Sequence, residues 1–217
     1  MISFTSNLSP KSDAIAIFVN EKHEYKDKKG VLPNTLKQKI NSFLKIVKVK
    51  KKEDEINSFD ISDTQKCFIV KVQNKYESFF PEESGGRFHS RLKKIKDLNS
   101  IDLYMDSLDL EKQKLIGFFS EFCLGFNLKS YTFNKYKTTN KEKINKKIIL
   151  KIITSHKENL QKEYKYYDAI KEGVFLSRDL VSEPPNVLNP KKYTEEIKKL
   201  TKLGLKVEIL NEAKLKK

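Results

Sequence analysis

Histidine and cysteine, the side chains that most often hold metals or act as nucleophiles, are scarce and scattered in this sequence. The three histidines, His23, His89 and His156, lie far apart, and none stands in a His-Glu-x-x-His pattern. Paired cysteines with the spacing of a zinc site are also absent. Each histidine is therefore expected to be a single side chain, at the surface or partly buried. The sequence predicts no metal ligand in these 217 residues.

The two cysteines are predicted to be buried, reduced thiols. Cys67 and Cys123 each stand within an apolar run, CFIV and FCLGF, which favours core packing over a disulfide. Neither has a histidine near it in sequence, and the Gly-x-Ser-x-Gly pattern of serine hydrolases is absent. Asp102 and Asp106 would share one side of a strand only in part, and they are expected to be solvated. We therefore predict no catalytic residue in the chain.

A glycine pair followed by an arginine, Gly85-Gly86-Arg87, could present backbone N–H groups to an anion at the start of a helix. The segment lacks the Gly-x-Gly-x-x-Gly and P-loop patterns. The favoured interpretation is a helix start with Ser84 as its cap, and no cofactor-binding residue is predicted. The aromatic segment 131–136 could stack on nucleobases, but packing against the core is favoured.

The charge balance raises the question of an anionic partner. The chain carries 44 Lys and Arg against 29 Asp and Glu, a net charge of +15, which suits nucleic acid or an anionic membrane. Only Arg87, Arg91 and Arg178 are arginines, and lysine is the poorer bidentate ligand of phosphate. The densest basic run, 48–52, is followed at once by three acidic residues. A compositional bias toward lysine is therefore favoured over a basic patch, and nucleic acid is kept as an alternative partner.

No signal peptide or membrane-spanning segment is predicted. The first apolar run, Ala14–Val19, is too short for the apolar region of a signal peptide. No other run approaches the ~20 apolar residues that span a bilayer. A soluble, cytoplasmic protein without a membrane partner is expected.

Apolar patterning alternates between strand-like and helix-like segments along the chain. Strands are predicted at 14–19, 67–72, 101–105, 147–153 and 205–210. Helices are predicted at 33–44, 84–98, 109–128, 157–181 and 191–203. Strands that alternate with helices predict an α/β fold with a mixed, mostly parallel sheet flanked by helices.

A proline-rich stretch, RDLVSEPPNVLNP (residues 178–190), overlaps the end of the longest predicted helix. Its two consecutive prolines cannot continue that helix. Asn189 is placed to cap the next helix, with Pro190 in its first turn, and Gly204 is placed as the C-cap of that helix. The stretch is therefore predicted to separate two parts of the chain.

Two motifs in the second half of the chain carry a family resemblance. They are GFNLKSYTFNKYKT (residues 125–138) and GVFLSRDLVSEPPNVLNP (residues 173–190), and the strand-like GLKVEIL follows. In order and spacing they resemble the leucyl aminopeptidase (cytosol aminopeptidase) family, at the end of its N-terminal domain and at the junction with its catalytic domain. Two departures occur at positions that are not catalytic in the family. Ser182 replaces the usual asparagine, and Gln73-Asn-Lys replaces a Gly-Leu-Gly turn.

The resemblance implies a macro-like N-terminal α/β domain at 1–153, a connecting helix at 154–182, and a truncated second α/β domain at 183–217 that begins the catalytic domain. It implies a cytoplasmic, hexameric metalloaminopeptidase that releases residues such as leucine from peptides, with two divalent cations (manganese, zinc or magnesium) activating a water. In the family the cation ligands lie in the catalytic domain, which includes an Asn-Thr-Asp-Ala-Glu-Gly-Arg motif absent from this chain. No catalytic, cofactor-binding or metal-ligating residue is carried over, and the chain alone is expected to be inactive.

Three interpretations follow for the chain itself. The first is the N-terminal portion of such an enzyme, as a fragment, a truncated gene product or an incomplete gene model. The second is a stand-alone binding or assembly module, with nucleic acid as a candidate ligand. The third is a remnant that folds poorly, because residues 190–210 would lack the sheet on which they pack.

Overall fold

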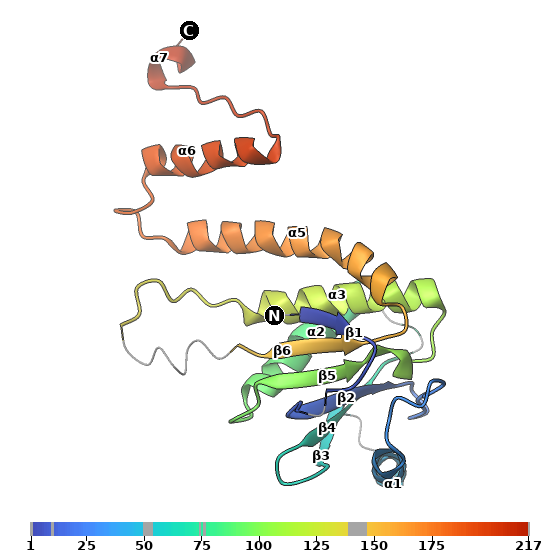
Figure 1. Ribbon diagram of the computed structural model, residues 1–217. Helices are drawn as coiled ribbons and strands as arrows, with labels where there is room; N and C mark the ends of the chain where they lie inside the picture. Colours follow the sequence, from blue (N-terminus) through green and yellow to red (C-terminus); the bar gives the residue numbers. More distant parts are fainter. Residues whose placement is uncertain are drawn as a thin grey trace. The chain divides into compact units, whose positions relative to one another are not determined.

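The computed structural model describes residues 2–9, 11–49, 54–73, 75, 77–138 and 147–216 (Figure 1). Part of the basic run 48–52, and Asn74 of the Gln73-Asn-Lys segment, lie outside the described residues. The chain divides into two compact units, Met1–Lys171 and Glu172–Lys217. The domain boundaries expected after residues 153 and 182 stay predictions.

A six-stranded sheet forms the centre of the first unit (Figure 1). In spatial order its strands are β1 (Ile2–Thr5), β6 (Ile149–Ile153), β5 (Ser100–Tyr104), β2 (Ala14–Val19), β4 (Lys66–Lys71) and β3 (Ile56–Asp60). All neighbouring strands pair in parallel except β3, which runs antiparallel to β4 at the edge of the sheet. The predicted mixed, mostly parallel sheet is thus confirmed.

The sequence of β2, AIAIFV, explains its place inside the sheet between β5 and β4. All six residues are buried, because a parallel strand covered on both faces needs apolar side chains at every position. Alternation along the strand sends Ala14, Ala16 and Phe18 to one face and Ile15 and Ile17 to the other. The two alanines leave room on their face for the large aromatic side chains that pack there.

Helices cover both faces of this sheet. α1 (Asn34–Val49) buries Leu36, Ile40 and Leu44 in the cluster that contains Ile15 and Ile17, and this spacing is that of one helical stripe. α2 (Phe80–Lys93) and α3 (Lys112–Ser130) contribute to the cluster on the opposite face. The helices predicted at 33–44, 84–98 and 109–128 are therefore confirmed as elements, with shifted ends.

An aromatic core lies between α3 and the sheet. The ring of Phe18 lies 4.7 Å from that of Phe119 and 5.4 Å from that of Phe122, both in edge-to-face arrangement. Phe88 of α2 lies 5.7 Å from Phe122 and 5.8 Å from Phe68 of β4. Each such aromatic pair stabilises the fold by about 0.5–1.5 kcal/mol beyond the burial of its surface.

Two glycines allow α2 and α3 to touch through their backbones. A Cβ atom at Gly85 would lie 2.0 Å from the carbonyl oxygen of Phe122, and one at Gly125 would lie 1.8 Å from that of Glu82. Real Cβ atoms do not approach backbone oxygens so closely, so only glycine fits at either position. The close approach brings the two aromatic-bearing helices together over one face of the sheet.

The start of α2 differs from the prediction for Ser84. The helix begins at Phe80, with Pro81 in its first turn, so Ser84 lies inside the helix and does not cap it. Its hydroxyl instead donates to a carboxylate oxygen of Glu55 at 2.6 Å. Of the glycine pair that suggested a helix start, Gly85 is required by the packing against α3.

Strands β1 and β3 were not predicted, whereas the strand predicted at 205–210 is wrong. β1 and β3 are short, and neither is fully buried; their strand identity comes from pairing with β6 and β4. Residues 205–210 have no strand pairing in the described part of the second unit, and Leu205 and Leu210 are exposed. Apolar alternation alone cannot make a strand without a neighbour to bond.

The second unit is helical. α5 (Lys157–Ser182) crosses the division between the units, and α6 (Pro190–Lys198), η2 (Lys199–Leu203) and α7 (Glu212–Leu215) follow. Gly204 adopts φ +87° after η2, which confirms its predicted role as a C-cap. No helix among the described residues has the length and apolarity needed to cross a membrane.

The Gly125→Ala substitution tests the backbone contact between α2 and α3. We expect it to lower the free energy of unfolding by at least about 3 kcal/mol, because the new methyl group must displace the backbone of α2. Gly117→Ala in the same helix is the matched control, since no atom lies within 4 Å of its added Cβ. That control should be neutral or stabilising by up to ~1 kcal/mol. Urea denaturation measures both, and equal effects of the two substitutions would contradict the contact.

Candidate functional site

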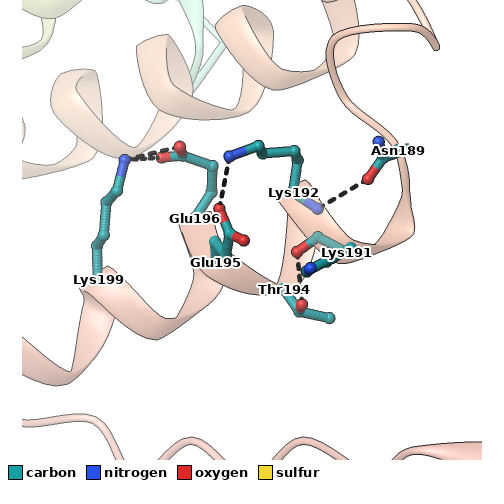
Figure 2. A network of polar contacts seen from close by, with 7 residues as sticks. All are labelled: Asn189, Lys191, Lys192, Thr194, Glu195, Glu196 and Lys199. Carbon is teal, nitrogen blue, oxygen red and sulfur yellow. Dashed lines mark hydrogen bonds and ion pairs between the residues drawn. The ribbon is translucent and has the colours of Figure 1, made fainter.

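The junction 178–190, singled out by its prolines, forms a turn between α5 and α6. α5 ends at Ser182, and the N–H groups of Val187 and Leu188 both donate to the carbonyl oxygen of Pro184 at 2.9 Å. The side chain of Asn189 accepts a hydrogen bond from the N–H of Lys192 at 3.0 Å (Figure 2). The predicted helix stop and N-cap are confirmed.

Exposed ion pairs follow the cap along α6 (Figure 2). Lys192 lies 2.9 Å from Glu195, and Lys199 lies 2.6 Å from Glu196. The hydrogen bond between Lys192 and Glu195 raises the pKa of the lysine and lowers the pKa of the glutamate. Each carboxylate is bound to a lysine three residues away in the sequence, and exposed pairs of this kind stabilise little. These groups support the helix and do not converge on a ligand.

No metal centre is found among the described residues, which contain no group of three or more His, Cys, Asp or Glu side chains able to hold a cation. His23 and His156 are partly buried single side chains, as expected. His89 differs, because it is buried beside Phe126, whose ring centroid lies 4.9 Å from its own. The prediction of a surface or partly buried side chain is wrong for His89.

Burial sets the charge state of His89. Its Nδ1 atom has no hydrogen-bond partner among the described residues. Burial, and then the positive charges of Lys93 and Lys129, lower the pKa of His89 from 6.5 to about 4. The ring is therefore neutral near pH 7. Periodicity along α2 could have placed it inside, because it neighbours Phe88 and precedes Leu92 by three residues.

The cysteines lie in the core as predicted. Both are free and buried. Burial raises the pKa of Cys67 to about 12, and it raises the pKa of the Cys123 thiol further. Because the thiolate is the reactive form, neither side chain is a nucleophile near neutral pH.

Asp102 is fully buried, so the expectation of a solvated side chain is wrong. One carboxylate oxygen accepts a hydrogen bond from the N–H of Ser9, while the other has no partner among the described residues. Burial raises the pKa of Asp102. Lys151, on the neighbouring strand β6, places its Nζ 3.2 Å from the hydroxyl of Ser9. These contacts attach the loop after β1 to the sheet.

The carboxylates of Asp106 and Asp27 also accept hydrogen bonds from other segments of the chain. Asp106 accepts hydrogen bonds from the hydroxyl of Thr154 at 2.6 Å and from the N–H of Ser155 at 2.8 Å. Asp27 accepts from the Tyr104 hydroxyl at 2.9 Å, from two backbone N–H groups, and from Lys37 at 2.6 Å. Burial alone would raise the pKa of Asp27, but these donors outweigh burial and lower it. Asp27 was not singled out by sequence, although the Asp-Lys-Lys-Gly turn that it opens was a signal for it.

The aromatic segment 131–136 packs on itself in the described structure. The rings of Phe133 and Tyr136 lie 5.8 Å apart, and Nζ of Lys135 lies 5.7 Å from the Tyr136 ring centroid. Tyr136 is exposed, so the expected packing against the core is wrong for that side chain.

Comparison with known proteins identifies the relatives of this chain, although no family model matches the sequence. It is 39% identical over 126 residues to a probable cytosol aminopeptidase of Agrobacterium fabrum, which covers 57% of this chain and 25% of the relative. It is 49% identical over 98 residues to a probable cytosol aminopeptidase of Phytoplasma mali, covering 44% of this chain and 20% of the relative. The chain is homologous to part of the cytosol (leucine) aminopeptidases. It matches the N-terminal portion of the family's members, about a fifth to a quarter of their length.

Solved structures show the same fold. A mutant of tomato leucine aminopeptidase superposes with a TM-score of 0.76 at 21% identity, covering 99% of this chain and 45% of the tomato chain. The bottromycin maturation enzyme BotP superposes with a TM-score of 0.61 at 13% identity, covering 94% of this chain and 40% of BotP. The sheet and helices described above are thus the N-terminal architecture of the aminopeptidase fold.

The buried His89 should make the stability of the first unit depend on pH. Its pKa of about 4 in the folded state is below the 6.5 of an exposed histidine, so the unfolded chain binds the proton more tightly. The stabilisation is complete above pH 6.5 and is lost as the pH falls toward 4. We expect His89→Leu to reduce the loss of unfolding free energy between about pH 7 and about pH 4.5 by about 2 to 3 kcal/mol. Urea denaturation at the two pH values measures this, and parallel pH dependence in both proteins would contradict it.

Proposed function

We propose that this chain supplies the N-terminal α/β domain, the connecting helix and the first part of the catalytic domain of a leucyl aminopeptidase. The complete enzyme would hydrolyse the N-terminal residue from peptides. The observation that carries this proposal is the identity of 39–49% to cytosol aminopeptidases over 98 to 126 residues. The structural likeness to tomato leucine aminopeptidase, which extends over 99% of this chain, supports it.

The catalytic chemistry belongs to the part of the enzyme outside this chain. Two divalent cations, manganese or zinc, would polarise the peptide carbonyl group and supply an activated water. The described residues contain no cluster of ligands that fits such cations. The aspartates that first looked relevant, Asp102 and Asp106, accept hydrogen bonds from their own domain. We therefore assign the cation ligands to the rest of the catalytic domain and assign no catalytic step to these residues.

The second unit would form the leading edge of that catalytic domain. Its helices and the extended segment after Gly204 expose the apolar side chains of Leu203, Leu205, Leu210 and Leu215. Such side chains are suited to packing against a larger sheet. In the same proposal the first unit is the macro-like domain of the enzyme, and the complete protein is cytoplasmic and hexameric.

The 217-residue chain should have no aminopeptidase activity. With leucine p-nitroanilide and added Mn²⁺ or Zn²⁺, we expect p-nitroaniline release indistinguishable from the buffer blank, because the described residues contain no group of ligands that could hold a cation. A full-length cytosol aminopeptidase under the same conditions serves as the control for substrate and metal.

Metal-dependent release by the chain that a chelator abolishes would overturn the assignment of the metal site to another part of the enzyme. The family relationship would survive that result, since it depends on sequence identity rather than on activity.

A further inference from the structure

A groove beside the contact between α2 and α3 gathers basic side chains that are distant in sequence. It has a volume of about 510 Å³. Arg87, Arg91 and Lys94 line it from α2 and its C-cap, and Lys129 lines it from α3. Two of the chain's three arginines therefore meet in one place. The expectation of evenly spread lysine charge does not account for this arrangement.

Only one of these four cations is neutralised within the described structure. Arg87 binds Glu55 through Nε at 2.7 Å and Glu83 through Nη1 at 3.0 Å. The side chains of Arg91, Lys94 and Lys129 make no ion pair or hydrogen bond among the described residues. Three uncommitted positive charges around one concave surface repel one another and raise the local concentration of anions.

The floor of the groove is kept open by Gly86. A Cβ atom there would lie 3.7 Å from the carbonyl oxygen of Gly125 and 3.8 Å from Cβ of Lys129, which is ordinary contact. Gly86 is therefore not required by the helix packing, in contrast to Gly85. Its missing side chain leaves space at the point where Lys129 enters the groove from α3.

We propose that this groove binds the phosphate group of a small phosphorylated molecule. The guanidinium group of Arg91 offers the planar donor fork that matches phosphate oxygens, and Lys94 and Lys129 add point charges. Three free cations suit the multiple negative charge of a phosphate or diphosphate better than the single charge of a carboxylate. The volume lies within the range of about 300–1,000 Å³ typical of small-molecule pockets. A second copy of this chain is a poor occupant, because each copy carries a net charge of +15.

The test is calorimetric titration of the 217-residue chain with inorganic pyrophosphate at low ionic strength. We expect saturable binding of one ligand per chain, with a Kd on the order of 0.1 mM. Arg91→Gln/Lys129→Gln should weaken binding by at least about tenfold, which corresponds to ~1.4 kcal/mol. Lys45→Gln/Lys48→Gln is the matched control, because it removes the same charge from exposed positions of α1 on the opposite face of the sheet. It should change the Kd by less than about twofold.

Gly86→Leu tests the groove itself with every charge retained. The leucine side chain would fill the open floor and should also weaken binding by at least about fivefold. Replacing a glycine inside a helix does not cost helix stability, so this variant tests the groove even if the double charge variant folds poorly. Thermal melting confirms the folding of each variant.

Two results would overturn the proposal. Equal weakening by the groove and α1 charge variants would mean that net charge alone attracts the anion. Binding of a single-stranded oligonucleotide without saturable binding of pyrophosphate would assign the basic surface to a nucleic-acid backbone.

Discussion

The backbone contact between α2 and α3 is the constraint on which the first unit depends. At Gly85 and Gly125 each helix presses against a carbonyl oxygen of the other, at distances that exclude any Cβ atom. This approach sets Phe88 of one helix beside Phe122 of the other, and Phe122 against Phe18 of the sheet. The aromatic core and the groove at its edge both follow from two residues that have no side chain.

That constraint also explains where the sequence was informative and where it was not. The continuous apolar run of β2 and the helical stripes of α1 and α3 identified those elements, because the number of buried faces determines the spacing of apolar residues along the chain. The helix caps near the junction were also predicted correctly. Asn189 is the N-cap of α6, and Gly204 is the left-handed C-cap of η2, as their residue types indicate. The glycine pair at positions 85 and 86 was misinterpreted as a helix start, because Gly85 is required by the contact with α3, which no local pattern shows.

The remaining errors involve pairing and burial between distant segments. β1 and β3 are short and partly polar, and each becomes a strand only by pairing: β1 with β6, far away in the chain, and β3 with β4, the next strand along. The segment 205–210 has the apolar alternation of a strand but no such neighbour. Asp102 is a polar residue inside the protein, and its burial involves a loop, at Ser9, that no local pattern connects to it. The burial of His89 could have been predicted from the periodicity of α2, although its contact with Phe126 of α3 could not. The basic groove was missed for the same reason, because Lys129 joins Arg91 only through the helix contact.

The relation of the chain to aminopeptidases depends on sequence identity. The proposal that the chain alone does not catalyse is motivated by the described residues, which contain no group of cation ligands. The most direct measurement of the central claim is the nucleotide sequence that follows codon 217 in the native gene. The account predicts that this sequence encodes the rest of a catalytic domain, with a lysine, aspartates and a glutamate in an Asn-Thr-Asp-Ala-Glu-Gly-Arg context. Downstream DNA that encodes no aminopeptidase-like sequence in any frame would contradict it.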